Sequence, residues 1–209
     1  GETGDPAIAA LEIDILMSHL ASADERTAMN RMQAELLSEA AETIAHRRLS
    51  LANSAGIALG EAFAFDLTRP GLALYGGIPR EELADHIRPV ASVEAQVLQT
   101  RNLAPGEGVG YNSAFIASTH MRVGTVSIGY ADGFLRARGA GNALSHKGRA
   151  LPILGKVSMD MVVVDLAEAS DVHAGDWLGV PWNIADAAQQ SAFSAYELLT
   201  TIGTRLRRS

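Results

Sequence analysis

The sequence predicts an α/β segment followed by a mainly antiparallel β domain. Up to Leu74, short apolar runs alternate with helix-like stretches, a rhythm typical of βα units and a parallel sheet. Beyond Arg88, short apolar runs are separated by Gly and Pro, which favours antiparallel strands or a barrel. The first pattern stops near residues 76–79 (GGIP), so we expect one domain at 1–82 and a second at 83–209.

The first domain is expected to contain three strands and one long helix. Apolar residues recur three and four positions apart between residues 24 and 46, which predicts an amphipathic helix capped by Ser22 or Asp24. The residues expected on its apolar face are Met29, Met32, Leu36, Leu37, Ala40 and Ile44. The expected strands span 11–18, 49–52 and 67–74, with a short helix at 57–62.

The second domain is expected to consist of short strands and one terminal helix. The strands expected from their apolar runs span 90–99, 121–128, 151–154, 161–166 and 177–180. A helical pattern at 184–201 closes the chain and is ended by Gly203.

Composition narrows the classes of function. The chain has 209 residues and a net charge of −7, which disfavours nucleic acid or an anionic membrane as a partner. It contains no cysteine, which excludes disulfides and thiolate zinc sites and fits a reducing compartment, so we expect a cytoplasmic protein without a metal. No apolar run reaches about 18 residues, the length that spans a membrane.

Seven segments together carry a specific resemblance. They are MSHLASADE (17–25), SLANSAG (50–56), DLTRPGLALYGG (66–77), GEGVGYN (106–112), VSIGYADGFLR (126–136), GKVSMDMVVVD (155–165) and YELLTTIGTRLRR (196–208). In this order they resemble alanine racemases, isomerases in which a (β/α)₈ TIM-type barrel carries pyridoxal 5′-phosphate (PLP) and precedes a β-rich domain. The resemblance therefore implies the C-terminal part of such a barrel followed by the β domain.

The resemblance begins at about the sixth strand of the barrel. A complete barrel typically needs about 250 residues, and only residues 1–82 are available for it here. The family's PLP lysine belongs to the missing part, and the chain's lysines are Lys147 and Lys156, both late in the sequence. We expect this chain to be one part of the active enzyme, inactive alone, with a separate N-terminal segment as one partner.

Racemisation removes the Cα proton on one face of an amino acid and returns it on the other. The resemblance implies that the PLP lysine and Tyr111 are the two opposed bases. It assigns Arg69 to the cofactor's pyridine nitrogen, to which an arginine can only donate, and places His19 beside the ring.

The remaining assignments concern the phosphate and the substrate. The resemblance implies that Ser54 and the backbone N–H groups of Gly71 and Leu72 bind the cofactor's phosphate. It gives the substrate carboxylate to the backbone amide of Met159, and matches Tyr130, Asp160 and Arg136 to the substrate site and its channel. Thr204 stands where some members have a phosphate-binding tyrosine. Because Tyr111 and Met159 act on the other subunit's site in this family, a homodimer is implied.

Three functions remain open at this level. The first is interconversion of L- and D-alanine, which would supply D-alanine for peptidoglycan. The second is a racemase of the same fold with broader substrate range. The third is a non-catalytic dimerisation or interaction fragment, which the absence of any lysine before Lys147 supports for this polypeptide.

Overall fold

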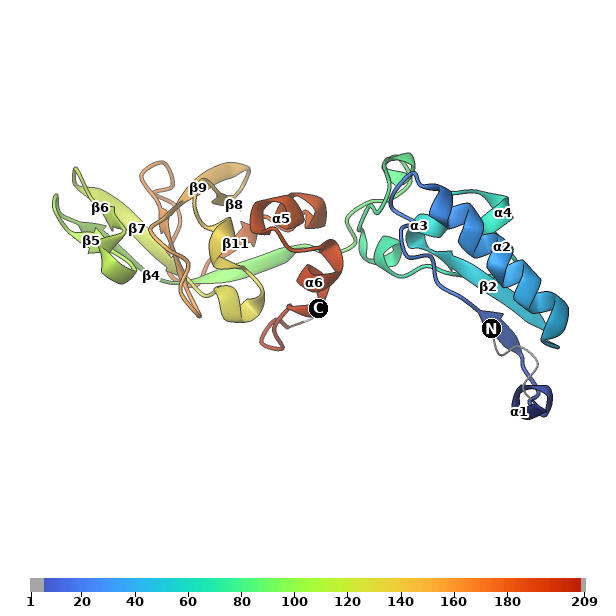
Figure 1. Ribbon diagram of the computed structural model, residues 1–209. Helices are drawn as coiled ribbons and strands as arrows, with labels where there is room; N and C mark the ends of the chain where they lie inside the picture. Colours follow the sequence, from blue (N-terminus) through green and yellow to red (C-terminus); the bar gives the residue numbers. More distant parts are fainter. Residues whose placement is uncertain (1–5, 208–209) are drawn as a thin grey trace. The chain divides into compact units, whose positions relative to one another are not determined.

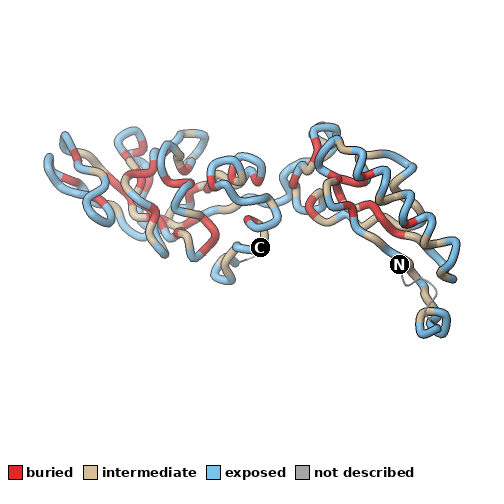
Figure 2. The backbone as a smooth tube through the Cα atoms, in the orientation of Figure 1, coloured by how far each residue is buried: buried red, intermediate tan, exposed pale blue. Residues whose placement is uncertain are grey.

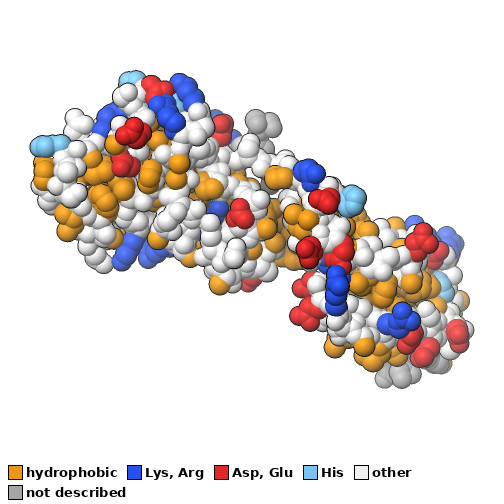
Figure 3. All heavy atoms as spheres, turned by 90° about the horizontal axis from the view of Figure 1, so that it is seen from above, with side chains coloured by type: hydrophobic (Ala, Val, Ile, Leu, Met, Phe, Trp, Pro, Cys, Tyr) orange, Lys and Arg blue, Asp and Glu red, His pale blue; other side chains and the backbone are white. Residues whose placement is uncertain are grey.

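The computed structural model describes residues 6–207 and contains two compact units, Gly1–Val90 and Ala91–Ser209 (Figure 1). Hydrophobic side chains lie among charged ones on the surface (Figure 3). Among residues 6–207, no helix is long and apolar enough to cross a membrane.

A three-stranded parallel sheet of order β1-β2-β3 forms the centre of the first unit. Its strands are β1 (Ile15–Met17), β2 (Arg48–Asn53) and β3 (Leu67–Arg69), and helix α1 (Pro6–Ala9) precedes them. Helix α2 (Ala28–Thr43) connects β1 to β2, and α3 (Ser54–Ile57) with α4 (Glu61–Ala64) connects β2 to β3. Two 3₁₀ helices follow, η1 (Leu72–Tyr75) and η2 (Glu81–Leu83). The expected βα rhythm is therefore present.

Several boundaries in this unit differ from the expected ones. The strand expected at 67–74 ends at Arg69, since Pro70 has no N–H for the ladder and η1 follows. The strand expected at 11–18 keeps only the three residues of β1. The helix expected at 57–62 is two short helices separated by Gly60, whose φ of 100° interrupts the helical path.

Helix α2 differs from its prediction in its cap and in its buried face. Its N-cap is Thr27, whose side chain accepts from the Met29 N–H, and not Ser22 or Asp24, which lie in the turns before the helix begins at Ala28. Leu37 is buried in a cluster with Leu20 and Leu51. Three residues of the predicted apolar face are exposed instead, namely Met29, Met32 and Leu36. Much of the helix is pale blue, the colour of exposed residues, in Figure 2.

A closed antiparallel barrel forms the second unit, with strand order β10-β7-β4-β11-β8-β9. Its strands are β4 (Val93–Leu103), β7 (Met121–Val126), β8 (Ala143–His146), β9 (Arg149–Leu154), β10 (Val162–Asp165) and β11 (Trp177–Val180). A two-stranded ribbon of β5 (Gly108–Val109) and β6 (Phe115–Ile116) extends from it. The barrel interior is apolar, with Val97, Val126, Leu144, Leu151, Val164 and Leu178 almost fully buried.

The sequence analysis missed several features of this unit, among them the ribbon of β5 and β6. Strand β8 was not expected, although Leu144 on it is fully buried. The terminal helix expected at 184–201 is two helices, α5 (Ile184–Ser191) and α6 (Ala195–Thr200). They are separate because Ala192 has a φ of 58° and Ser194 starts α6 with a capping box to Glu197.

Candidate functional site

The first unit gathers four of the predicted cofactor residues at the carboxyl ends of its strands. His19 lies two residues beyond β1, Ser54 directly follows β2, Arg69 ends β3, and Gly71 lies two residues further on. Parallel strands have their carboxyl ends at one edge, where barrel enzymes place their catalytic groups. The structure therefore brings these residues to one edge of the sheet.

Arg69 is held in place by acceptors on strand β2 and by one in the residue after β1. Its Nη1 donates to Ser50 Oγ at 2.5 Å, and its Nη2 donates to the carbonyls of Ser18 at 2.7 Å and Leu51 at 3.3 Å. Ser50 Oγ in turn donates to the Leu67 carbonyl at 2.7 Å. Within residues 6–207 the Arg69 Nε has no acceptor, so a fixed guanidinium keeps a donor available.

Ser54 is buried, and its oxygen accepts two backbone N–H groups. Gly71 N donates to it at 2.8 Å and Ala73 N at 3.2 Å. Ala73 was not among the predicted residues, whereas the predicted Leu72 N–H has no acceptor among the described residues. The Ser54 hydroxyl hydrogen has no acceptor among them either, and a Cβ built on Gly71 would meet nothing within 4 Å. Open space thus adjoins donors that suit an anion.

The backbone around His19 is fixed by a residue that the sequence analysis did not single out. Gln33 on α2 donates to the His19 carbonyl at 3.3 Å and accepts from Ala21 N–H at 3.0 Å. The imidazole of His19 is exposed and has no hydrogen-bond partner among residues 6–207. The turn that carries His19 is therefore ordered by its backbone, while the ring is available to a ligand.

The second unit brings together the four predicted substrate residues. Tyr130 N–H donates to the Ser158 carbonyl at 3.1 Å, and Ala131 N–H donates to the Met159 carbonyl at 3.0 Å. A Cβ on Gly129 would lie 2.3 Å from the Met159 carbonyl oxygen, so only glycine permits this approach. The 3₁₀ helix η4 (Tyr130–Asp132) thus lies directly against the turn at 158–161.

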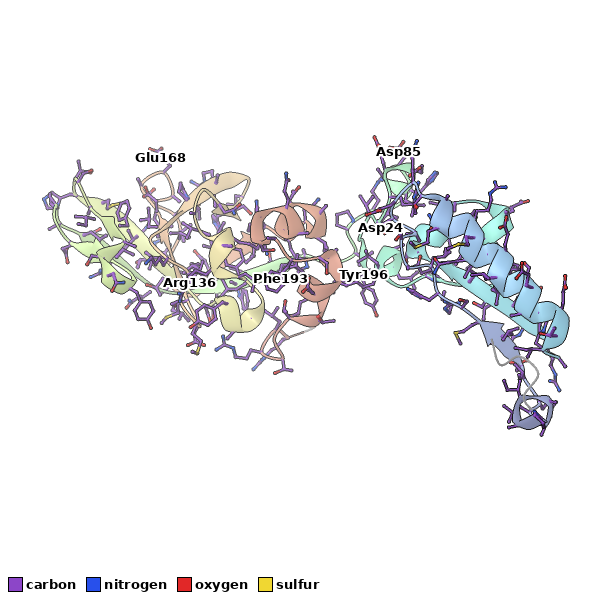
Figure 4. All side chains as sticks on the ribbon, in the orientation of Figure 1. Asp24, Asp85, Arg136, Glu168, Phe193 and Tyr196 are labelled. Carbon is purple, nitrogen blue, oxygen red and sulfur yellow. The ribbon has the colours of Figure 1, made fainter. Side chains whose placement is uncertain are left out.

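Arg136 completes this surface. It begins the 3₁₀ helix η5 (Arg136–Arg138), is labelled in Figure 4, and donates from Nε to the Val157 carbonyl at 3.2 Å. Its guanidinium carbon lies 5.2 Å from the centroid of the Tyr130 ring, within the range of a cation–π contact. Tyr130 and Arg136 therefore form one continuous patch with the segment that leads to Met159.

The turn at 158–161 exposes two backbone donors. It is closed by Ser158 N–H to the Met161 carbonyl at 3.0 Å and by Met161 N–H to Ser158 Oγ at 3.1 Å. Within the described residues the N–H groups of Met159 and Asp160 have no acceptor, and the Met159 residue is 51% exposed. Adjacent free amides in a tight turn form an anion-binding concavity, which suits a carboxylate.

Tyr111 lies in a strained turn beside the same segment. It is 63% exposed at the start of the 3₁₀ helix η3 (Tyr111–Ser113), in which Asn112 and Ser113 have φ values of 60° and 47°. A Cβ built on the preceding Gly110 would lie 3.5 Å from the backbone nitrogen of Lys156, so this turn and the segment leading to Met159 are close. Residues held in such backbone regions cluster at functional sites.

Two residues of the C-terminal segment, Arg205 and Thr204, differ in the contacts that their side chains make. Arg205, which the sequence analysis did not single out, donates to the carboxylates of Asp132 and Asp160, and these bonds raise its pKa. Its signal was its place in the last matching segment, YELLTTIGTRLRR. Thr204 is exposed and its side chain has no hydrogen bond within residues 6–207, so its proposed phosphate contact stays a prediction.

Comparisons with known proteins follow the same division of the chain. The family described as alanine racemase, C-terminal domain, matches residues 90–209, and the family described as alanine racemase, N-terminal domain, matches residues 6–79. The alanine racemase of Acidiphilium cryptum is 39% identical over 197 residues, which cover 92% of this chain and 55% of that protein. Two relatives from Agrobacterium fabrum, named catabolic and biosynthetic alanine racemase, are 37% and 36% identical, cover 95% and 93% of this chain, and are themselves covered to 53% and 54%.

A solved structure agrees with these relatives. The alanine racemase from Bartonella henselae with covalently bound pyridoxal phosphate has a TM-score of 0.86 and 34% identity, covering 99% of this chain and 59% of that one. The present chain spans about half the length of the curated relatives that it matches. The comparisons confirm the predicted fold class, the C-terminal part of a (β/α)₈ barrel followed by a mainly antiparallel β domain. The chain belongs to the alanine racemase family.

Proposed function

We propose that this chain is the C-terminal part of a PLP-dependent isomerase that interconverts L- and D-alanine. The observation that carries the proposal is the fixed guanidinium of Arg69, which keeps a free Nε donor at the same strand edge as the Ser54 hydroxyl. This combination of donors at the carboxyl end of a parallel sheet suits a phosphorylated heteroaromatic ring. We propose residues 1–82 as the barrel segment and 83–209 as the β domain.

The described residues of the first unit fit PLP. The Ser54 hydroxyl hydrogen and the Leu72 N–H would hold the phosphate, with Gly71 leaving room for it. Arg69 would donate to the ring nitrogen, and His19 would lie beside the ring. When bound, PLP supplies an electron sink that makes the substrate's Cα proton removable. Because arginine keeps its own proton, Arg69 donates to the nitrogen without protonating it, which limits side reactions.

The residues of the second unit would handle the amino acid. The free N–H groups of Met159 and Asp160 would bind the substrate carboxylate. The Tyr111 hydroxyl would take or return the proton on one face, opposite a PLP lysine from the part of the barrel that this sequence does not span. Tyr130 and Arg136 would line the channel through which the substrate reaches this turn.

The proposal includes an assembly and a cellular role. A homodimer would let Tyr111 and Met159 of one subunit complete the site of the other, in agreement with their exposure here. We place the enzyme in the cytoplasm, supplying D-alanine for peptidoglycan. Its relatives carry both biosynthetic and catabolic names, so a catabolic role is the alternative.

The decisive experiment joins this chain to a lysine-bearing N-terminal barrel half. That half comes from upstream in its own reading frame or from the Acidiphilium cryptum relative. With PLP, the joined protein should produce D-alanine from L-alanine, whereas the 209-residue chain alone should neither turn over nor form a borohydride-trapped PLP adduct. A joined protein that dimerises and binds PLP without racemising any amino acid would overturn the proposal. Racemisation of serine or lysine at rates equal to alanine would favour the broader-specificity alternative.

A further inference from the structure

The Arg205 side chain connects two acidic residues that lie 28 positions apart in the sequence. Its Nε and Nη2 donate to the two carboxylate oxygens of Asp132, at 2.9 and 2.8 Å, and its Nη1 donates to Asp160 Oδ1 at 2.6 Å. This is a bidentate pair with one carboxylate and a single bond to another, a geometry that arginine forms and lysine does not. Arg205 therefore ties together the two segments that bear Asp132 and Asp160.

Asp132 is the buried end of this connection. Its side chain is 5% exposed, and its Oδ2 also accepts the Gly129 N–H at 3.0 Å. Among residues 6–207, Arg205 is the one cation that forms an ion pair with Asp132. A buried carboxylate that loses its counter-charge is strongly destabilising, so Arg205 is needed to keep η4 in its present position.

Asp160 is the second end, and it lies in the turn with the free amides. The backbone of η4 already holds this turn through Tyr130 N–H to Ser158 and Ala131 N–H to Met159. Arg205 adds a bond to Asp160 on the other side of Met159. Arg205 therefore holds this turn in two ways: directly, through Asp160, and indirectly, through Asp132 in η4, whose backbone binds Ser158 and Met159.

The chain has little freedom to place Arg205 elsewhere. A Cβ built on Gly203 would lie 2.5 Å from the Ala131 carbonyl oxygen, and one on Gly133 would lie 3.1 Å from the Thr201 carbonyl oxygen. The segment after α6 thus packs directly on η4; the contact at Gly203 leaves no room for a Cβ, and the φ of 90° at Gly133 favours glycine there. This packing aims the Arg205 side chain at the two carboxylates.

We propose that Arg205 is a positioning residue, which holds the free N–H groups of Met159 and Asp160 in place to receive the carboxylate of the amino-acid substrate. Arg205 touches neither substrate nor cofactor in this role. The inference rests on the proposed function for the identity of the ligand. Its mechanical part, that Arg205 keeps the turn at 158–161 in place, concerns this chain alone. A simple anchor for the C-terminal segment would stabilise the fold without affecting substrate affinity.

Hydrogen exchange on the 209-residue chain tests the mechanical part. In Arg205→Gln, the amides of Gly129, Tyr130, Ala131, Ser158 and Met161 should exchange about tenfold faster, because the turn opens locally. Arg205→Lys should recover part of the protection. The matched control is Arg149→Gln, which breaks another arginine–aspartate pair of the same unit, with Asp171, and should leave these five amides unchanged. If Arg205→Gln does not fold, Asp160→Asn keeps the buried pair and should still loosen Ser158 and Met161.

Kinetics of the joined, PLP-loaded enzyme test the positioning part. A carboxylate contact is made equally in the ground and transition states, so its loss raises KM and leaves kcat nearly unchanged. Arg205→Gln should raise the KM for alanine about tenfold and weaken inhibition by propionate, the carboxylate without the amine, by a similar factor. Unchanged exchange, or a lower Tm with unchanged KM and propionate inhibition, would overturn the inference. A wild-type joined enzyme that lacks racemase activity would refute the proposed function while the exchange result still decides the mechanical part.

Discussion

Replacing Gly129 by alanine should displace the turn that carries Met159. The added Cβ would lie 2.3 Å from the Met159 carbonyl oxygen and 2.5 Å from that of Ser158, and both are backbone atoms that cannot rotate away. Because Gly129 has a φ of −154°, which any residue adopts, the effect is purely steric. Overpacking costs about 1–3 kcal/mol and each of the two weakened backbone bonds about 0.5–1.5 kcal/mol. We expect the free energy of unfolding of the second unit to fall by about 2–6 kcal/mol.

Urea unfolding of the 209-residue chain, followed by a probe in the barrel, measures this loss. The contrasting variant is Gly148→Ala, whose φ of 80° is strained for alanine but whose Cβ would meet nothing within 4 Å. That variant should cost about 1 kcal/mol. In the joined enzyme only Gly129→Ala should also raise the KM for alanine, because it alone moves the free amides. A loss below about 0.5 kcal/mol for Gly129→Ala, within the range of an ordinary surface substitution, would show that η4 does not lie against the turn at 158–161.

Three further predictions use other parts of the chain. Tyr111→Phe in the joined enzyme should lower kcat by about 10²–10⁴ without loss of PLP, unequally for the two directions of Cα-proton exchange; values within about twofold of wild type for both enantiomers would remove Tyr111 from the mechanism. Hydrogen bonds from Arg149 and Lys147 lower the pKa of Asp171 to about 2, so the stability they add is present above the ordinary aspartate pKa and disappears as the pH falls from about 4 through about 2. Asp171→Asn should therefore lose less stability than wild type over that interval in unfolding titrations, and parallel curves would contradict the ion pair. Finally, β1 and β3 each pair only with β2 among the described residues, so the amides of Ile15–Met17 should exchange faster than those of Met121–Val126 in the isolated chain. Equal and deep protection of both strands would show that the parallel sheet is complete without further strands.

Alternation of apolar residues located most strands of the barrel. The strand expected at 177–180 has the same bounds as β11, because Leu178 and Val180 both face the interior and turn residues lie on either side. Strand β8 was missed because its four residues, ALSH, include only one large apolar side chain. The sequence did contain one signal, Gly148. It forms with Lys147 the two-residue turn between β8 and β9, in which both residues have positive φ.

Helical periodicity was a poorer guide to which face of α2 is buried. The spacing of Met29, Met32 and Leu36 fits one apolar stripe, yet these residues are exposed while Asn30 is buried. The Asn30 side chain donates to the Glu25 carbonyl at 3.0 Å, which gives that carbonyl, in the turn before the helix, a hydrogen-bond partner. Periodicity reports that a helix has an apolar side; contacts from the rest of the fold decide which residues are covered.

Individual residues of the candidate site could be predicted from the sequence only where they belong to a short motif of the family. The motifs gave Arg69, Ser54 and Met159, but not the bonds that hold them, because those bonds come from residues distant in sequence. Ser50 fixes Arg69 from 19 positions away, and Arg205 reaches Asp132 across 73. No pattern in a single sequence predicts either contact, since a serine within a strand and an arginine near a terminus are ordinary features. The groups proposed to touch a ligand are therefore easier to predict from this sequence than the groups proposed to position them, although Arg205→Gln and Gly129→Ala should move the same two amides of the turn at 158–161.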